Sequence, residues 1–339
     1  MLPSKMSLSE RIGVLLFELI PLAIKKFFLT LKHTPLLFAF LIVSFSSTVY
    51  LFYGQFEPAG IGILVGVLAC LVLALLAGII FLFTKNYEAP EIDIKKPKFK
   101  LTVLIIYFLF LAIASTHGIN GLDLLQYIPG SEALTRFFST QLPQFLQHSF
   151  QMSGETAEGI SGAVSQLILL VLIPLTVFKM IFKYRYRDMG ISIRFWWLGV
   201  TLMLIYTCTE LTGSLIFFGS AYLNRAFLLD FAFMFAYAGI TEEFFFRGLM
   251  QPHFEKLSKN KLNGVVLTSI VFALAHVPIR IHMIGFEPLL VLTSCLGIPA
   301  IGALFAGYLY LKTRSLAPGA LIHAWFDVSL FAFLSMGLG

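Results

Sequence analysis

Apolar runs of membrane-spanning length constrain this chain more than any other feature. Leu, Phe, Ile, Val and Ala dominate stretches of about twenty residues or more, the length that an α-helix needs to cross a bilayer. Only 12% of the 339 residues are charged, whereas about 25% is usual in a soluble domain. A soluble all-α enzyme would also need polar faces at helical spacing, and these runs lack them. The sequence therefore predicts an all-α, polytopic membrane protein.

The apolar runs divide the chain into a series of predicted transmembrane helices. They lie at about 35–54, 60–84, 101–117, 161–182, 195–222, 226–250, 263–279, 288–311 and 318–338. A run at 8–31 is interrupted by charged residues and predicts an amphipathic helix that lies at the membrane interface. The more polar segment 117–159 predicts a long loop with short interfacial helices. These features together predict a helical bundle of about eight or nine spans that follows an interfacial helix.

The distribution of Lys and Arg predicts how the bundle is oriented. If the N-terminus is cytoplasmic and every predicted span crosses, the outer loops carry only Arg136, Arg225 and Arg280. Inner loops such as 95–100 and 183–194 are rich in basic residues, which is the asymmetry of the positive-inside rule. Because the net charge of +6 is spread over short loops, no nucleic-acid partner is predicted. We expect an integral, multi-pass protein of the cell membrane whose N-terminus is cytoplasmic.

Ionisable residues inside the predicted spans mark the candidate site, because a charge in the bilayer needs a partner or a function. Glu242, Glu243 and Arg247 form the densest group, on the span at 226–250. Glu243 and Arg247 are four residues apart, so they share one helix face and can form an ion pair. Glu242 points about 100° away from Glu243 and has no counter-ion on its own helix. Such a carboxylate suits a general base, although both acids can also pair with basic groups on other helices.

Two further spans carry histidines. Phe272 and His276 lie four residues apart on the short span at 263–279, and His323 and Asp327 have the same spacing on the last span. A single histidine on an apolar helix is usually a packed core residue. Three helices that each bring an acid or an imidazole instead favour a shared cavity in the bundle interior. We expect this cavity to be hydrated and to open toward the cytoplasm.

The pattern resembles the EExxxR, FxxxH and HxxxN/D motifs of the CAAX protease and bacteriocin-processing family. This family of glutamate intramembrane proteases includes the type II CAAX prenyl endopeptidases and members linked to peptide processing or bacteriocin immunity. The matching residues are Glu242-Glu243 with Arg247, Phe272 with His276, and His323 with Asp327, in that order. The resemblance covers about residues 180–335. We therefore expect residues 1–160 to form an N-terminal membrane region with the interfacial helix, three spans and a polar extracytoplasmic loop, and residues 161–339 to form a protease-like helical core.

The resemblance implies a hydrolytic mechanism without a cofactor. By position, Glu242 and His276 would activate a water for attack on a peptide carbonyl, and His323 with Asp327 would stabilise the oxyanion. Glu243 and Arg247 would support Glu242 as a structural pair. The implied substrate is a membrane-associated peptide or protein, either prenylated or an exported precursor. The sequence sets no oligomeric state.

Residue 327 departs from the prenyl endopeptidases, which resemble this chain with Asn at the equivalent position. An ionised Asp donates no hydrogen bond and would repel an oxyanion. Asp327 must therefore be protonated, orient His323, or bind a cation. Its four-residue spacing from His323 permits the orienting role.

Three other functions compete with the glutamate protease. A zinc-dependent membrane protease is one, because Glu242, His276, His323 and Asp327 are all acceptable zinc ligands. The HExxH helix that is typical of zinc proteases is missing from the sequence. A non-catalytic membrane partner, such as an immunity protein, is the second. A proton-coupled transporter is the third, because buried acids and histidines also build proton relays.

Overall fold

The computed structural model describes residues 29–30, 32–53, 59–115, 133, 136–218, 225–258 and 260–337. Helices and turns are the regular elements of these residues, which contain no strand. The predicted all-α class is therefore confirmed. The predicted interfacial helix at 8–31 lies almost wholly outside the described residues.

Most helices lie close to the predicted spans. The first half of the chain forms α3 (Pro35–Tyr53), α4 (Ala59–Thr84), α5 (Pro97–Ala114), η3 (Phe137–Gln141), α7 (Leu142–Phe150), α8 (Gly154–Gln166), η4 (Leu167–Leu172), α9 (Ile173–Thr176) and η5 (Val177–Ile181). The second half forms η6 (Tyr186–Met189), α10 (Trp196–Phe218), α11 (Arg225–Met234), η7 (Phe235–Gly239), α12 (Ile240–Glu242), η8 (Glu243–Met250), α13 (Gln251–Leu257), α14 (Lys261–Ala275), α15 (Val277–Ile284), α16 (Pro288–Leu296), α17 (Ile298–Thr313) and α18 (Ala317–Gly337).

Several helices are suited to a bilayer. Among the described residues, five are long and apolar enough to cross a membrane: Gly66–Thr84, Pro97–Ala114, Gly154–Ile181, Lys261–Ile284 and Pro288–Thr313. Shorter apolar helices occupy Pro35–Leu51 and Trp196–Thr209. These helices indicate a membrane protein. The total of eight or nine spans, and the orientation of the N-terminus, stay predictions.

Two helix boundaries differ from those predicted. The helix predicted at 161–182 begins earlier, at Gly154, because Ser153 caps it: the Ser153 Oγ accepts a hydrogen bond of 3.2 Å from the backbone N–H of Thr156. The span predicted at 263–279 continues through α15 to Ile284. Arg280 was assigned to an outer loop and instead lies on this helix.

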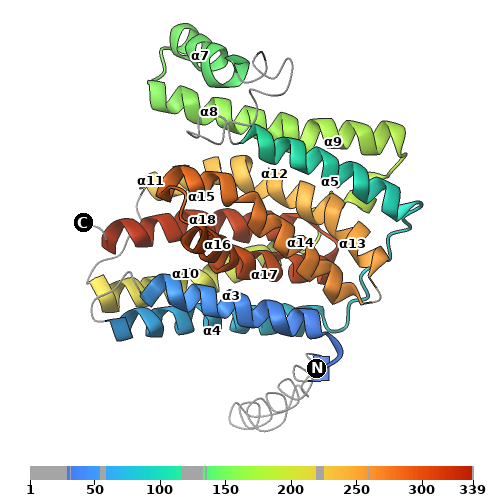
Figure 1. Ribbon diagram of the computed structural model, residues 1–339, viewed down its shortest axis with the longest axis vertical. Coiled ribbons are helices and arrows are strands. Elements are labelled where there is room, and N and C mark those ends of the chain that lie inside the picture. The colour runs from blue at the N-terminus through green and yellow to red at the C-terminus, as the bar shows by residue number, and fades with distance from the viewer. Residues whose placement is uncertain are drawn as a thin grey trace.

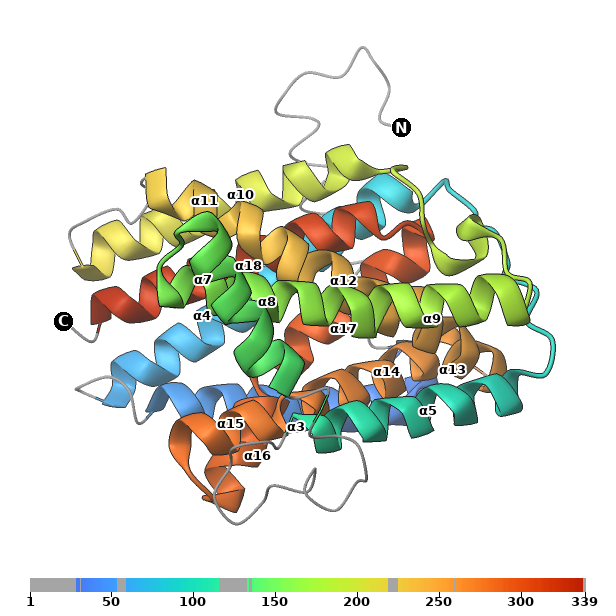
Figure 2. The same ribbon diagram turned by 90° about the horizontal axis from the view of Figure 1, so that it is seen from above.

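The helices are arranged in three tiers (Figure 1). The run from α8 to η5 lies alongside α5 on one side, while α3, α4 and α10 cover the opposite side. Between them lie α12 to α18, and the view from above shows α14 and α18 running toward the same end of the bundle (Figure 2). The central tier therefore holds the segments that carry the predicted site residues.

Glycines bring α18 close to the helix that carries the acid pair. A Cβ atom at Gly239 would lie 2.6 Å from the carbonyl oxygen of Ala320, far inside a van der Waals contact. A Cβ atom at Gly319 would lie 3.0 Å from Oε2 of Glu243. Only a residue without a side chain permits this approach. The first turns of α18 can thus pack directly against η7 and η8.

Candidate active site

A buried ion pair forms the base of the site. Nη1 of Arg247 lies 3.3 Å from Oε1 of Glu243, and both side chains are 1% exposed. Nη2 of Arg247 donates a hydrogen bond of 3.2 Å to the carbonyl oxygen of Ala303, and the guanidinium lies 4.4 Å from the ring centroid of Phe272. The structure thus contains the i,i+4 pair that the spacing suggests. The pair also joins η8 to α17 and α14.

His323 is held by the same glutamate. Its Nδ1 lies 2.9 Å from Oε1 of Glu243, and because a carboxylate only accepts, the ring N–H donates. This bond turns Nε2 toward two other carboxylates, at 3.8 Å from Oε2 of Glu242 and 3.6 Å from Oδ2 of Asp327. Glu243 therefore binds Arg247 along its own helix and His323 across the bundle. Sequence reasoning missed the second contact, which joins residues 80 positions apart.

Asp327 does not orient His323 through a hydrogen bond. The distance of 3.6 Å between Asp327 Oδ2 and His323 Nε2 exceeds hydrogen-bond length, while Glu243 occupies the other ring nitrogen. The orienting role that the spacing permits for Asp327 thus belongs to Glu243. Asp327 is an electrostatic neighbour of the imidazole.

His276 lies at the junction of α14 and α15. Helix α14 ends at Ala275, and Pro278 follows within α15, where it cannot donate a backbone hydrogen bond. Nδ1 of His276 lies 2.9 Å from the carbonyl oxygen of Phe272, so this nitrogen carries the hydrogen. In the neutral ring, Nε2 then holds a free lone pair and can accept a proton.

Phe272 brings the two imidazoles together. Its ring centroid lies 4.9 Å from that of His276 and 5.6 Å from that of His323. The structure thereby gathers residues from η8, α14 and α18 around one phenyl ring. Nε2 of His323 lies 3.8 Å from Oε2 of Glu242, and the rings of His323 and His276 both lie beside Phe272.

The acids of the cluster differ in their access to solvent. The side chain of Glu242 is 17% exposed and that of Asp327 is 30% exposed, whereas that of Glu243 is 1% exposed. Glu243 is sealed inside the protein by Arg247 and His323. Glu242 and Asp327 thus form the more exposed, accessible edge of the cluster.

A metal centre would need several ligating side chains that point toward one position. In the part of the chain that the structure describes, no three His, Cys, Asp or Glu side chains are arranged to hold a metal ion. The carboxylate of Glu243 is already engaged by Arg247 and His323. The described residues thus offer no preformed ligand set for zinc.

A second buried network joins α5 to α13 outside the cluster. Nζ of Lys100 donates to the hydroxyl of Tyr184 at 3.3 Å, and this hydroxyl lies 3.1 Å from Nε2 of His253. Nδ1 of His253 donates to the carbonyl oxygen of Leu249 at 2.6 Å, so Nε2 accepts from the Tyr184 hydroxyl. Burial lowers the pKa of His253 to about 4 and raises that of Tyr184 well above its usual value. His253 is therefore neutral and structural.

A further buried ion pair fixes the end of α17. The guanidinium of Arg314 binds Glu255 through both nitrogens, with Nη2–Oε2 at 2.5 Å and Nη1–Oε1 at 3.2 Å. Burial alone would lower the pKa of Arg314, but the charge of Glu255 raises it. Gln251 donates to the same carboxylate at 2.8 Å and to the carbonyl oxygen of Gly307 at 2.9 Å. These contacts hold α13 against α17.

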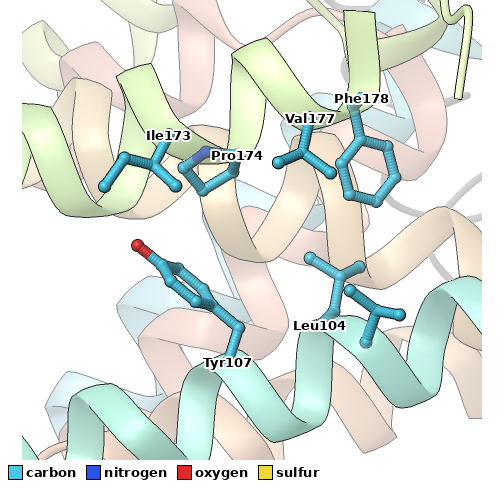
Figure 3. Close-up of a pocket in the computed structure, with 7 residues that line it drawn as sticks. Leu104, Tyr107, Ile173, Pro174, Val177 and Phe178 are labelled. Atoms are coloured by element: carbon cyan, nitrogen blue, oxygen red, sulfur yellow. The ribbon is translucent and has the colours of Figure 1, made fainter. Parts of the chain in front are cut away.

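A small apolar cavity lies between α5 and the α9–η5 segment (Figure 3). Its volume is about 70 Å³, and it is lined by Val103, Leu104, Tyr107, Ile173, Pro174, Val177 and Phe178. The hydroxyl of Tyr107 donates to the carbonyl oxygen of Leu169 at 2.7 Å. The lining thus presents hydrocarbon and no catalytic group. The candidate chemistry lies in the cluster around Phe272.

Comparison with known proteins agrees with the motif pattern. Residues 224–329 match the family model described as type II CAAX prenyl endopeptidase Rce1-like. This segment contains the acid pair, both histidines and Asp327. Searches of curated proteins and of solved structures found no match. The predicted resemblance is thus confirmed for residues 224–329, which form a domain similar to the type II CAAX prenyl endopeptidases.

Proposed function

We propose that this protein is an intramembrane endopeptidase that hydrolyses a peptide bond of a membrane-associated substrate with a water activated by Glu242 and His276. The observation that carries this proposal is the arrangement of His323 between sealed Glu243 and accessible Glu242. In a purely structural ion-pair network, each carboxylate would be buried against its partners, as Glu243 is. Glu242 instead lies at the accessible edge. A hydrolase needs such a carboxylate at the place where water enters.

Glu242 and His276 have different roles in activating the water. Glu242 accepts a proton from the water as general base, and the resulting hydroxide attacks the peptide carbonyl. Nε2 of His276 carries the free lone pair and positions the water through a hydrogen bond. The proton held by Glu242 then passes to the leaving amine as the carbon–nitrogen bond breaks. Each such proton transfer typically contributes about 10²–10⁴-fold to the rate.

His323 is the proposed oxyanion donor. Its Nδ1–H is fixed on Glu243, so a second proton on Nε2 points toward the open edge between Glu242 and Asp327. An imidazolium in this position donates to the negative oxygen of the tetrahedral intermediate. Asp327 acts by favouring the charge on this ring and needs no direct contact with the oxyanion. Preorganised donors of this kind typically contribute about 3–4 kcal/mol.

The proposed substrate carries its cleavage site near a membrane-associated terminus. The family description points to C-terminal CAAX sequences, whose cysteine receives a prenyl group. A lipidated terminus is delivered to the bilayer, where the cluster lies among apolar helices. An exported peptide precursor is the other substrate class that this placement allows.

The test is peptide cleavage by purified wild-type protein and by Glu242→Gln, which keeps the size of the side chain and removes the base. We expect cleavage to fall by about 10²-fold or more in Glu242→Gln. Glu155→Gln on exposed α8 is the matched control and should retain wild-type activity. Wild-type cleavage by Glu242→Gln would overturn the mechanism. Cleavage that stops with a chelator and returns with zinc would replace it by a metal mechanism.

A further inference from the structure

Gln166 is a polar residue inside one of the helices that are long enough to cross a membrane. It is the last residue of α8, within the span Gly154–Ile181, and the six apolar residues of η4 follow it. An amide within the bilayer needs a hydrogen-bond partner, because an unpaired polar group is costly to bury there. Gln166 is partly buried, and it lies outside residues 224–329, the domain that matches the family model. Its partners therefore show what this helix contributes to the site.

The partners of the Gln166 amide lie in the turn that precedes Glu242. The hydroxyl of Thr241 donates to Oε1 of Gln166 at 3.2 Å, and it also donates to the carbonyl oxygen of Tyr237 in its own helix. The amide interacts with the hydroxyl of Tyr237 as well, and Glu242 acts electrostatically on this tyrosine. The Tyr237 ring lies against Gly162, one turn earlier on α8. The tier that contains α8 thus contacts the turn before the proposed base (Figure 1).

The backbone of this turn has an irregular hydrogen-bond pattern. The N–H of Ile240 donates to the carbonyl oxygen of Phe235, five residues back. The N–H of Glu243 donates to the carbonyl oxygen of Ile240, three residues back. The spacing of the hydrogen bonds therefore changes across Glu242, as it does where π-helical turns interrupt an α-helix. Because no regular ladder fixes this turn, its shape depends more strongly on the side chains that bind it.

The carboxylate of Glu242 has no hydrogen bond that would orient it within the described chain. Nε2 of His323 lies 3.8 Å from Oε2 of Glu242, which is beyond hydrogen-bond length. Glu243, by contrast, is fixed by Arg247 and by His323. The direction of the Glu242 side chain is therefore set by the backbone turn from which it projects. A displacement of about 1 Å at a catalytic group can cost about 10²-fold in rate, so the shape of this turn matters for a general base.

We propose that Gln166 is a positioning residue for Glu242, which acts through Thr241 and Tyr237 on the turn that presents the base to the water. The inference rests on the proposed peptidase function and adds to it a residue from outside the domain at residues 224–329. Gln166 touches neither the water nor the peptide. Its hydrogen bond with Thr241 fixes the turn against α8, so that Glu242 keeps the direction in which it can accept a proton. The domain thus needs α8 to complete its site.

The test measures kcat and KM for peptide cleavage by the full-length protein in detergent micelles, with Gln166→Leu and Thr241→Val as variants. Each variant removes one side of the hydrogen bond and keeps a side chain of similar size. We expect each to lower kcat by about tenfold, as for the loss of a hydrogen bond, and to leave KM within about twofold of wild type. Because both changes act through one bond, the double variant should have the kcat of the slower single variant. Thr241→Ser keeps the hydroxyl and should retain most of the wild-type kcat.

Gln144→Leu on α7 and Thr176→Val on α9 are the matched controls, because both residues are exposed and lie away from the turn. Each should keep the wild-type kcat. Wild-type kcat in Gln166→Leu, a change in KM alone, or a double variant whose loss is the product of the single losses would overturn the role of Gln166. If Gln166→Leu does not fold, the Thr241 variants decide: equal kcat for Thr241→Val and Thr241→Ser refutes the proposal, and a loss confined to Thr241→Val supports it. Absence of cleavage by the wild type would instead overturn the proposed peptidase function, and this inference with it.

Discussion

His253 and His276 share the same local geometry and differ in what their other ring nitrogen meets. Each uses Nδ1 to donate to the carbonyl oxygen four residues earlier, of Leu249 and Phe272 respectively. Nε2 of His253 accepts from Tyr184 in a closed network. For Nε2 of His276, the described residues provide no hydrogen-bond partner. Both ring nitrogens of His253 are hydrogen-bonded within the protein, whereas Nε2 of His276 keeps a lone pair that can bind a water molecule or a substrate.

The two histidines show which feature distinguishes a reactive residue from a structural one in a helical membrane protein. A histidine inside an apolar helix carries little information by itself, because backbone carbonyls can always satisfy one of its nitrogens. The second nitrogen separates a structural role from a reactive one. The same distinction separates Glu243, sealed by Arg247 and His323, from its neighbour Glu242 at the accessible edge.

The strongest test replaces His276 by Gln. If Nε2 of His276 positions the attacking water, cleavage should fall by about 10²–10⁴-fold, the usual contribution of a general acid or base. Thermal unfolding should change little, since Gln can donate to the carbonyl oxygen of Phe272 in place of Nδ1. His253→Gln should show the reverse, with a lower unfolding temperature and retained activity. Equal loss of activity in the two variants would break the comparison.

Glu243→Gln should have the next largest effect, chiefly on stability. The change removes the carboxylate that forms the ion pair with buried Arg247, and loss of one partner of such a pair typically costs about 3–5 kcal/mol. It also replaces the charged acceptor of the His323 Nδ1–H by a weaker, neutral amide oxygen. The free energy of unfolding in mixed micelles should therefore fall together with activity. A variant of wild-type stability would show that Arg247 finds another counter-ion.

A third test uses pH to probe the closed network of His253. The pKa of His253 is about 4 in the folded protein and about 6.5 when exposed, so the unfolded chain binds the extra proton between these values. Stability should therefore fall as the pH drops from about 6.5 to about 4, by up to about 3 kcal/mol. His253→Phe should lack this part of the pH dependence. Parallel unfolding curves for wild type and variant across this range would contradict the closed network.

Sequence reasoning predicted what depends on spacing along one helix. Apolar runs predicted the helices, and i,i+4 spacing placed Glu243 beside Arg247. Helical spacing could not predict contacts made by packing between helices, such as the hydrogen bond that His323 donates to Glu243. The reason is that spacing along one helix does not specify which face of another helix it meets. Gly239 and Gly319 allow these helices to approach closely, but their role becomes apparent only from the position of α18 in the structure.

Arg280 shows the same limit from the opposite direction. Charge counting placed it in a loop, because the apolar run ends shortly before it. The helix continues to Ile284, since the first turn of α15 closes on His276. A residue that looked like a topology signal thus lies next to an imidazole of the site.

Asp327→Asn should have the smallest effect. In the structure, Asp327 lies 3.6 Å from Nε2 of His323 and makes no hydrogen bond to it, because Glu243 already fixes the ring. Removing the negative charge of Asp327 should slightly destabilise the imidazolium form of His323. We therefore expect activity within about tenfold of wild type, which corresponds to about 1.4 kcal/mol. Cleavage assays of the wild-type protein and the variant with the same peptide provide the measurement. A loss comparable to that of His276→Gln would mean that Asp327 takes part directly in proton transfer, and that the accessible edge holds two reactive acids.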